Sequence, residues 1–422
     1  MTSLVQCCAD EAQPPRERRW LALLSRSRVQ LFGGLLLGVG LPALPEWNAL
    51  SANAVLGSAA ALVVGYGVLR RLSAFPGVDP RTYAPPVFAL TYGLAAAALL
   101  SVGLGFRQQQ MVAGFGLASA WFFAIQFVTQ ERLRRRLVVV PGERARDMGA
   151  IRGVDVIPLH EPDPSRLKAD AIIADFRAGM PREWEAFIAR AVMEGYPVYH
   201  AKQIVETLTG KVEIGSLADN TFGSVLPLLA YAKLKRLIDL VGVVALAPVF
   251  LPVIAVAALL IKLDSPGPVF FSQKRVGYRG RFFTIHKLRT MHVGAQALSH
   301  FTSADDTRIT RVGALLRKVR IDEFPQIWNI AKGEMSWIGP RPEAVALAGG
   351  YESSIPFYNF RHVLRPGISG WAQVNQGNVA ELAAATEKLQ FDFYYIKHFS
   401  PWLDALIAAK TIRTMLTGFG AR

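Results

Sequence analysis

Apolar stretches dominate the first third of the chain, at about 30–47, 49–69, 84–106 and 111–129. Each is close to the ~20 residues that an α-helix needs to cross the hydrocarbon core of a bilayer. The first makes the shortest continuous helix, because Pro42 and Pro45 interrupt it. We therefore expect a bundle of four transmembrane helices over residues 30–133, after a polar tail at 1–29. Only 19% of the residues are charged and 51% are hydrophobic, as expected of a membrane protein with soluble parts.

Arginines around these stretches predict their orientation. Basic residues precede the first stretch, separate the second from the third and follow the fourth: Arg16, Arg18, Arg19, Arg26 and Arg28; Arg70, Arg71 and Arg81; Arg132, Arg134, Arg135 and Arg136. The other two connections carry only Glu46 and Arg107. The positive-inside rule then places both ends of the bundle, and the chain after residue 131, in the cytoplasm. A signal peptide cleaved after Ala52-Asn53-Ala54 is the alternative, but it leaves three spans with the wrong charge pattern.

Residues 134–225 have the composition of a soluble α/β domain. Short apolar runs typical of buried strands occur at 137–140, 154–157, 171–174 and 196–199, and 184–193 has helical periodicity. Strands that alternate with helices favour a small parallel, Rossmann-like sheet. No G-x-G-x-x-G follows the first strand, so a dinucleotide site is not supported. A regulatory or oligomerising role is the simplest interpretation, and a homo-oligomer is one consequence.

A second long apolar segment, residues 237–261, contains Pro248 and Pro252 and has basic residues at both ends. A fifth crossing is one interpretation. A helix broken at Pro248 is the one we favour, because each half then covers about one leaflet and both ends stay cytoplasmic. This re-entrant helix would hold a soluble domain against the membrane. Asp239, one turn after Arg236, is expected to form an ion pair at the interface.

Two adjacent carboxylates, Asp322 and Glu323, lie in a segment rich in basic residues. The neighbours are Arg308, Arg311, Arg317, Lys318, Arg320 and Arg341. Nearby positive charge is expected to lower the pKa of Asp322 and to keep it ionised. An ionised, partly desolvated Asp can attack phosphorus, and arginines bind phosphate oxygens in pairs. The alternative is a solvated ion-pair network without catalytic function.

The net charge of +15 fits anionic lipids and phosphorylated substrates. No motif supports nucleic-acid binding. The two cysteines, Cys7 and Cys8, are neighbours and cannot form a disulfide framework or a metal site. Residues 399–415 suit an amphipathic helix that either lies on the membrane or packs on the catalytic core.

The motifs from Lys233 to Leu416 resemble the catalytic domain of the bacterial sugar transferase family, the polyprenol-phosphate phosphoglycosyl transferases. The matching stretches include Lys235-Arg236-Leu237-Ile238-Asp239, Lys287-Leu288-Arg289-Thr290-Met291, Asp322-Glu323, Gly339-Pro340-Arg341-Pro342, Arg365-Pro366-Gly367 and Asp392-Phe393-Tyr394-Tyr395. The four spans and the α/β insert also resemble the large members of this family, the undecaprenyl-phosphate galactose or glucose phosphotransferases. Ala247 departs from the Ser that often precedes the helix-breaking proline.

The resemblance implies a monotopic α/β catalytic domain at 226–422 on the cytoplasmic face of a bacterial inner membrane. It implies transfer of a hexose 1-phosphate, glucose or galactose, from a UDP-sugar to undecaprenyl phosphate with release of UMP. Such a reaction initiates exopolysaccharide, capsule or O-antigen synthesis. A membrane scaffold of a polysaccharide assembly complex is the alternative, but it would not need the Asp322-Glu323 pair.

Under this resemblance, Asp322 is the expected nucleophile and would form a covalent phosphosugar intermediate. Glu323 is expected to support it, and the pair is expected to bind Mg²⁺ together with substrate phosphates. The expected substrate-binding side chains are Lys287, Arg289, Arg341, Arg365, Gln373 and Asn375. Membrane lipids are the remaining expected partner.

Overall fold

The computed structural model describes residues 23–44, 49–76, 78–132, 135–141, 154–162, 169–176, 179–213, 229–294, 306–376 and 382–417. The predicted tail up to residue 22 and the predicted domain boundary near residue 225 lie outside these residues. The chain forms two compact units, Met1–Gly210 and Lys211–Arg422. Lys211 and Val212 contact the second unit, because the backbone N–H of Val212 donates to Gln390 O at 3.0 Å and Lys211 pairs with Glu387.

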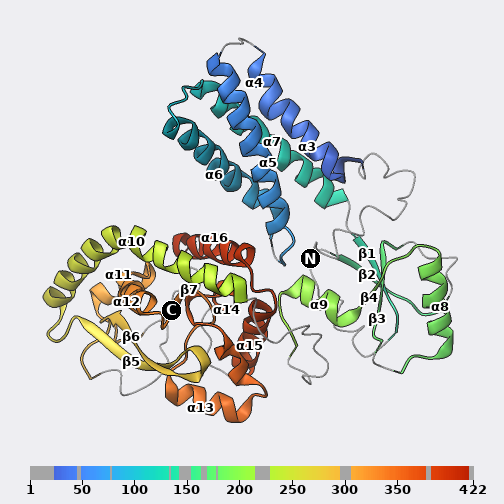
Figure 1. Ribbon diagram of the computed structural model, residues 1–422. Coiled ribbons are helices and arrows are strands. Elements are labelled where there is room, and N and C mark those ends of the chain that lie inside the picture. Colours follow the sequence, from blue (N-terminus) through green and yellow to red (C-terminus); the bar gives the residue numbers. More distant parts are fainter. Residues whose placement is uncertain are drawn as a thin grey trace. The chain divides into compact units, whose positions relative to one another are not determined.

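The first part of the N-terminal unit is the predicted helical bundle (Figure 1). Its first helix consists of α3 (Ser27–Leu35), a π-helical turn η2 (Leu36–Gly40) and α4 (Leu41–Ala43). Three longer helices follow, α5 (Ala49–Leu72), α6 (Pro80–Ser101) and α7 (Gln108–Arg132). These three are long and apolar enough to cross a membrane, whereas the first is shorter, consistent with its prolines.

Glycines let the first helix of the bundle approach α7 closely. A Cβ added to Gly33 would lie 2.1 Å from the Trp121 ring, and one added to Gly38 would lie 3.0 Å from Ala118 Cβ. The indole N–H of Trp121 donates to Gln30 O at 2.9 Å. Small residues at helix crossings are the usual means of packing helices in a membrane, where burial of apolar surface gives no driving force. The predicted four-helix bundle is therefore present.

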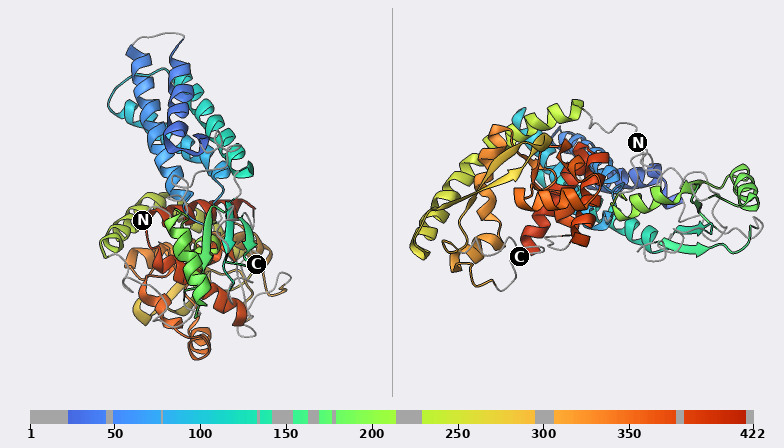
Figure 2. Two further views of the ribbon diagram at one scale, coloured as in Figure 1. Left: turned by 90° about the vertical axis from the view of Figure 1, so that its right-hand side faces the viewer. Right: turned by 90° about the horizontal axis from the view of Figure 1, so that it is seen from below.

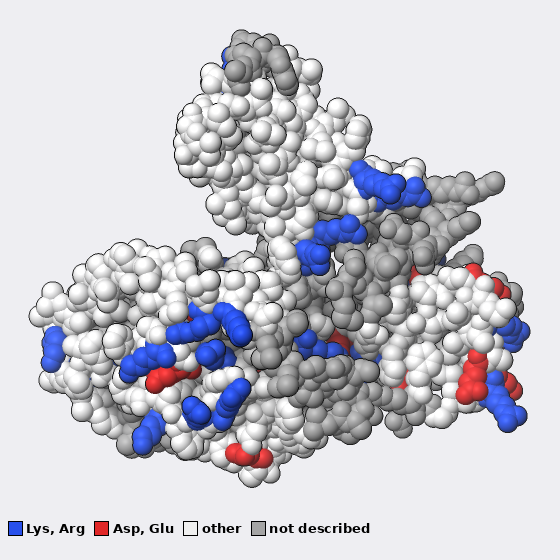
Figure 3. Space-filling model, in the orientation of Figure 1, with Lys and Arg blue, Asp and Glu red and all other residues white. Residues whose placement is uncertain are grey.

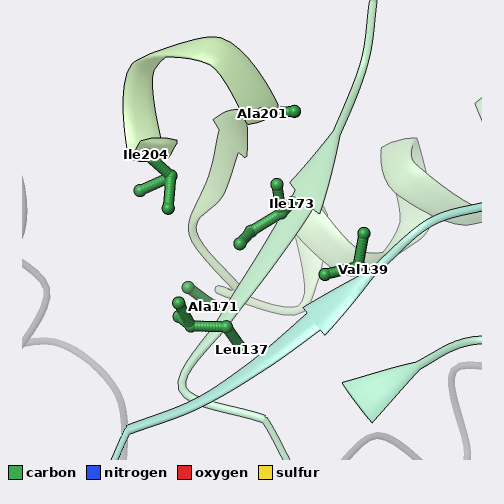
Figure 4. Close-up of a cluster of buried hydrophobic side chains, with 6 residues drawn as sticks. All are labelled: Leu137, Val139, Ala171, Ile173, Ala201 and Ile204. Atoms are coloured by element: carbon green, nitrogen blue, oxygen red, sulfur yellow. The ribbon is translucent and has the colours of Figure 1, made fainter. Parts of the chain in front are cut away.

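The second part of this unit is a parallel four-stranded sheet of order β2-β1-β3-β4. The strands are β1 (Arg135–Val139), β2 (Val154–Pro158), β3 (Ala171–Ala174) and β4 (Val198–His200), with helices α8 (Arg182–Met193) and α9 (Ala201–Thr209). Alternate residues of β1 and β3 face opposite sides, as the strand period of two requires. Leu137 and Ile173 pack with Ile204 of α9 (Figure 4), whereas Val138 and Ile172 pack with Phe187 of α8. The predicted Rossmann-like domain is confirmed.

The second unit, Lys211–Arg422, is called the catalytic unit below, after the role that the family resemblance predicts for it. Its first long helix is α10 (Leu229–Asp264), which contains the predicted membrane segment. The predicted break at Pro248 is wrong, because the helix continues through both Pro248 and Pro252. Each proline removes a backbone donor and pushes on a carbonyl one turn earlier, which bends a helix without having to end it. The ribbon of α10 changes direction part-way along its length in Figures 1 and 2. Most of its apolar side chains are exposed, as expected of a lipid-facing helix, and α10 is the fourth helix suited to a membrane.

Buried polar side chains fasten α10 to the rest of this unit. Asp239 accepts hydrogen bonds from Ser336 Oγ at 2.9 Å and from the backbone N–H of Trp337 at 3.3 Å, so it binds the strand that contains both residues. The predicted ion pair between Asp239 and Arg236 does not form among the described residues. Arg236 instead donates to Ile330 O at 2.6 Å and Ala331 O at 2.8 Å. Helix α10 is therefore attached to the rest of this unit by side-chain hydrogen bonds.

The remaining elements build a compact α/β body around α10. Strands β5 (Phe270–Val276) and β6 (Phe282–Leu288) pair antiparallel, and β7 (Ser336–Ile338) and β8 (Gly367–Ser369) pair parallel. The helices are α11 (Arg311–Lys318), α12 (Ile327–Lys332), α13 (Val345–Ser354), α14 (Trp371–Asn375), α15 (Leu382–Lys397) and α16 (Pro401–Thr417), with 3-10 turns η7 (Tyr278–Gly280), η9 (Ile321–Gln326) and η10 (Tyr358–Val363). Leu403, Leu406 and Ile407 of α16 are fully buried, so this helix packs on the core, the second of the two predicted alternatives.

Candidate active site

The Asp322-Glu323 pair lies in η9, a tight 3-10 turn between α11 and α12. Arg320, just before it, has a left-handed backbone (φ 56°), which reverses the chain after α11. A 3-10 helix has three residues per turn, so neighbouring side chains point about 120° apart. Asp322 and Glu323 are only 9% and 5% exposed. The two carboxylates are therefore buried in different surroundings.

The carboxylate of Glu323 is paired with three basic side chains. Its Oε1 lies 2.7 Å from Arg341 Nη2 and 3.2 Å from Lys287 Nζ, and its Oε2 lies 3.6 Å from Arg320 Nη1. Burial by itself would raise the pKa of Glu323, but these three cations outweigh burial and hold the pKa well below its usual range. Figure 3 shows one face of the catalytic unit, on which Lys and Arg side chains gather around an acidic patch.

The carboxylate of Asp322, unlike that of Glu323, has no ion-pair partner among the described residues. It also accepts no hydrogen bond from the residues that the structure describes. Burial, and then the charge of Glu323, raise the pKa of Asp322 to about 6, although Lys287, Arg317 and Arg341 oppose the rise. The predicted lowering of the Asp322 pKa is therefore wrong, because Lys287, Arg320 and Arg341 form their ion pairs with Glu323 and not with Asp322. Asp322 is still mostly ionised at pH 7, and it is a stronger base than an exposed Asp.

Lys287 reaches the dyad from β6, where it pairs with Phe271 of β5. Its side chain is 16% exposed, and partial burial lowers the pKa of its ammonium group while the charge of Glu323 opposes the change. Arg341 reaches Glu323 from the loop after β7. Gly339 makes this loop possible, because a Cβ there would lie 2.3 Å from Arg365 O. Two of the predicted substrate-binding side chains therefore contact the dyad.

The backbone of Arg341 is held by a buried ion pair between Arg361 and Asp392. Arg361 Nη2 donates to Arg341 O at 2.9 Å and pairs with Asp392 Oδ2 at 2.8 Å, and its Nη1 donates to Tyr358 Oη at 2.7 Å. Arg361 and Asp392 are buried. Neither residue was among the predicted site residues, although Asp392 lies in one of the motifs that carry the family resemblance. A charged residue inside an otherwise apolar, aromatic motif was the available signal.

Four predicted site residues lie elsewhere in the described structure and make no contact with the dyad there. Arg289 donates to Ser265 O and Pro266 O, both at 2.7 Å, and so supports the loop after α10. Arg365 donates to Gly333 O at 3.0 Å. Gln373 donates to Ile368 O at 3.1 Å, and Asn375 donates to Trp371 O at 2.8 Å. All four have backbone partners, which favours a structural role, most clearly for the buried Arg289.

The bend of α10 contacts the dyad's own turn. Phe250, two residues after Pro248, stacks on Phe324 with ring centroids 3.9 Å apart and an interplanar angle of 6°. Phe324 directly follows Glu323, so the position of η9 depends on the shape of the membrane helix. This contact places the dyad beside the helix of this unit that is long and apolar enough to enter a membrane.

The dyad also offers oxygen atoms for a hard cation. Glu323 Oε2 is buried and has no hydrogen-bond partner among the described residues, and Asp322 is the preceding residue in the chain. No group of three or more His, Cys, Asp or Glu side chains suited to a metal occurs in the described part of the chain. These donors fit Mg²⁺, which commonly binds one or two carboxylates together with water and substrate phosphates.

Comparison with known proteins identifies the family to which this chain is similar. Residues 230–418 match the family model described as bacterial sugar transferase. The chain is similar to a UDP-N-acetylgalactosamine-undecaprenyl-phosphate N-acetylgalactosaminephosphotransferase of Aeromonas hydrophila, with 41% identity over 418 residues, 96% of this chain and 99% of that relative. This similarity includes the bundle and the Rossmann-like domain.

Two further relatives match the catalytic unit. They are UDP-glucose:undecaprenyl-phosphate glucose-1-phosphate transferases of Caulobacter vibrioides and Escherichia coli. The first is 41% identical over 46% of this chain and 74% of the relative, and the second is 39% identical over 42% of this chain and 39% of the relative. The predicted resemblance is confirmed, and the chain belongs to the bacterial sugar transferase family.

Proposed function

We propose that this protein transfers a sugar 1-phosphate from a UDP-sugar to undecaprenyl phosphate and releases UMP. The observation that carries the proposal is the state of Asp322, which is buried, free of described hydrogen bonds and adjacent to a carboxylate held by three cations. A membrane scaffold has no need of such an arrangement. The names of the relatives support the same reaction. The catalytic unit would act on the cytoplasmic face of a bacterial inner membrane and initiate a lipid-linked glycan.

The first step is attack by Asp322 Oδ on the sugar-linked phosphorus of the donor. The new P–O bond forms as the bond to the bridging diphosphate oxygen breaks, and UMP leaves with that oxygen and its electron pair. The raised pKa of Asp322 makes the carboxylate a better nucleophile than an exposed Asp. Arg317 and Arg341 lie near enough to Asp322 to influence its charge, so they can also stabilise the phosphate oxygens.

The second step is attack by a phosphate oxygen of undecaprenyl phosphate on the same phosphorus. The acyl phosphate bond breaks, Asp322 regains its carboxylate, and the lipid carries the sugar through a diphosphate. Separating the two steps lets UMP leave before a second anion enters the site. The stacking of Phe250 on Phe324 keeps the dyad next to the membrane helix, where a lipid phosphate would arrive.

Glu323 Oε2 and Asp322 are the residues that would hold Mg²⁺. When bound, this ion supplies positive charge to the phosphate oxygens of the donor. Lys287 and Arg341 on the other oxygen of Glu323 keep this carboxylate ionised and oriented. Removing Mg²⁺ with a chelator should therefore stop turnover, and adding it back should restore turnover.

The donor sugar is the finer part of the proposal. Glucose and galactose were expected from the resemblance. The relative that matches the whole chain is named for N-acetylgalactosamine, so this sugar joins them as a candidate. Because the bundle and the Rossmann-like domain are also shared with that relative, we place UDP-N-acetylgalactosamine first in the panel of donors to be tested.

The test is release of UMP by the purified protein in detergent or nanodiscs, given Mg²⁺, undecaprenyl phosphate and a panel of UDP-sugars. UMP from one donor is the expected product. Asp322→Asn should reduce it by at least ~10³-fold and leave the melting temperature unchanged, because the amide cannot attack phosphorus. Asp264→Asn, at the end of α10, is the matched control and should remain active. Release of UDP in place of UMP would show direct glycosyl transfer and contradict the covalent mechanism.

A further inference from the structure

A cavity of about 620 Å³ opens on the catalytic unit between the β5–β6 hairpin, α13 and η10. Its walls include Phe282, Ala348, Gly349, Phe360 and His362. None of Asp322, Glu323, Lys287 and Arg341 lines it. Ligand-binding cavities commonly have volumes of ~300–1,000 Å³, so this one is large enough for part of a substrate.

A short strap of chain connects the cavity to the dyad. Arg341 contacts Glu323 at 2.7 Å, and Val345, four residues later, lines the cavity. Between them, Glu343 O accepts a hydrogen bond from Val276 N at 3.1 Å, and Val276 is also a wall residue. Four residues span at most ~14 Å even when fully extended. An elongated ligand can therefore reach from the cations at the dyad into the cavity.

The turn η10 makes a second connection. Arg361 donates to Arg341 O at 2.9 Å, while its two neighbours, Phe360 and His362, line the cavity. One turn thus supports the phosphate-binding arginine and forms a wall of the cavity. A ligand held at both places would contact two sides of a single rigid element.

The walls suit a flat heterocycle better than a hexose. Phe282, 67% exposed, and Phe360 offer apolar faces, and Ala348 adds a small apolar surface. The polar side chains of the lining are Arg279, Glu352, Asn359 and His362. Asn359 donates to Glu352, and burial together with the charge of Arg361 lowers the pKa of His362 to about 4, so its imidazole is neutral at pH 7. A hexose has hydroxyl groups on all sides, and those facing apolar walls would lose their hydrogen bonds. A nucleobase has apolar faces, with its donors and acceptors at the edge.

We propose that this cavity holds the nucleoside half of the UDP-sugar donor, with the uracil ring on the wall formed by Phe282 and Phe360. The inference rests on the proposed function and adds to it the place where the donor's base is recognised. The diphosphate then extends along the strap towards Lys287 and Arg341, and the sugar-linked phosphorus reaches Asp322. UMP keeps its base contacts after the first step and leaves through the open side of the cavity.

Two adjacent glycines of α13 give a matched test. A Cβ added to Gly349 or to Gly350 meets no atom within 4 Å, so a large side chain is accommodated at either position. Only Gly349 lines the cavity. Gly349→Trp should fill the cavity, raising the KM for the UDP-sugar and the Kd for UMP by at least tenfold each. The KM for undecaprenyl phosphate should not change. Gly350→Trp should match the unmodified protein in all three constants.

The measurements are UMP binding by calorimetry and the kinetics of UMP release, on the full chain in detergent, with melting temperatures to compare folding. Phe360→Ala is a second variant and should weaken UMP binding without affecting the binding of ribose 5-phosphate, which lacks the base. Unchanged UMP binding in Gly349→Trp would overturn the inference. A raised KM for the donor alone would assign the cavity to the sugar, and a raised KM for undecaprenyl phosphate alone would assign it to the acceptor.

These outcomes are separate from failure of the proposed function. An unmodified protein that releases no UMP from any donor would contradict the reaction, whereas UMP binding would still report on the cavity. If the unmodified protein is active and Gly349→Trp leaves the Kd for UMP unchanged, only the assignment of the cavity is contradicted.

Discussion

Acidification should slow the first step of the proposed reaction, because Asp322 must be ionised to attack phosphorus. With its pKa at about 6, about nine-tenths of the carboxylate is ionised at pH 7 and about one-tenth at pH 5. The second-order rate constant for the first round of UMP release should therefore fall about tenfold between these two pH values. An Asp with the ordinary pKa of 3.8 would remain about nine-tenths ionised at pH 5, and the rate would hardly change.

Two substitutions should move the midpoint of this pH profile in opposite directions. Glu323→Gln removes the negative charge that raises the pKa of Asp322, so the midpoint should move to lower pH by roughly one unit. Lys287→Met removes a positive charge that opposes the rise, so the midpoint should move to higher pH by a similar amount. One unit corresponds to about 1.4 kcal/mol of electrostatic interaction. Both variants are expected to be slower, but the direction of each shift does not depend on the absolute rate.

The assay is the rate of the single round of UMP release from the donor, at low donor concentration and without the lipid acceptor. Omitting the acceptor matters because a phosphate monoester has its second pKa near ~6 and would add its own titration. Glu334→Gln is the control, since Glu334 bonds Asn329 and is not part of the dyad. A profile for the unmodified protein that stays flat down to pH 5, or shifts of the same sign in both variants, would refute the assignment of Asp322 as the titrating nucleophile.

Three further predictions concern the residues that position the dyad. Arg361→Lys should lower kcat by ~10–100-fold and also lower the melting temperature, because a lysine cannot hold Arg341 O, Asp392 and Tyr358 at once and leaves buried groups without partners; a variant with unchanged kcat would contradict its positioning role. Gly339→Ala should cost about 1–3 kcal/mol in urea unfolding, because its Cβ would meet Arg365 O, whereas Gly350→Ala, in open space, serves as the tolerated control. Phe250→Ala should lower the rate of UMP release by loosening η9 while membrane insertion is unchanged, and full activity in this variant would show that the stack on Phe324 has no part in catalysis.

Much of the fold could be predicted from local patterns. The apolar stretches and the arginines between them predicted the bundle, and short β-branched runs predicted all four strands of the Rossmann-like sheet. The prediction for α10 was wrong, because it assumed that a proline must interrupt a helix. Pro248 was expected to end a helix, but the flanking apolar residues continue it, and in the structure the proline lies inside a bent α10. A lost backbone hydrogen bond can be absorbed by bending when helical turns on both sides are intact.

The sequence by itself determined the membrane character of the chain, its family and the two carboxylates most suited to chemistry, because composition, periodicity and motif order are properties of neighbouring residues. Only the tertiary structure decided how charge is divided between those carboxylates. Lys287 lies on β6 and Arg341 follows β7, and the fold directs both to Glu323, so Asp322 is left with a raised pKa. Arg289, equally basic and only two residues from Lys287, is used to hold a loop. Which partner a charged side chain meets depends on contacts between distant segments, and adjacency in the chain carries little information about them.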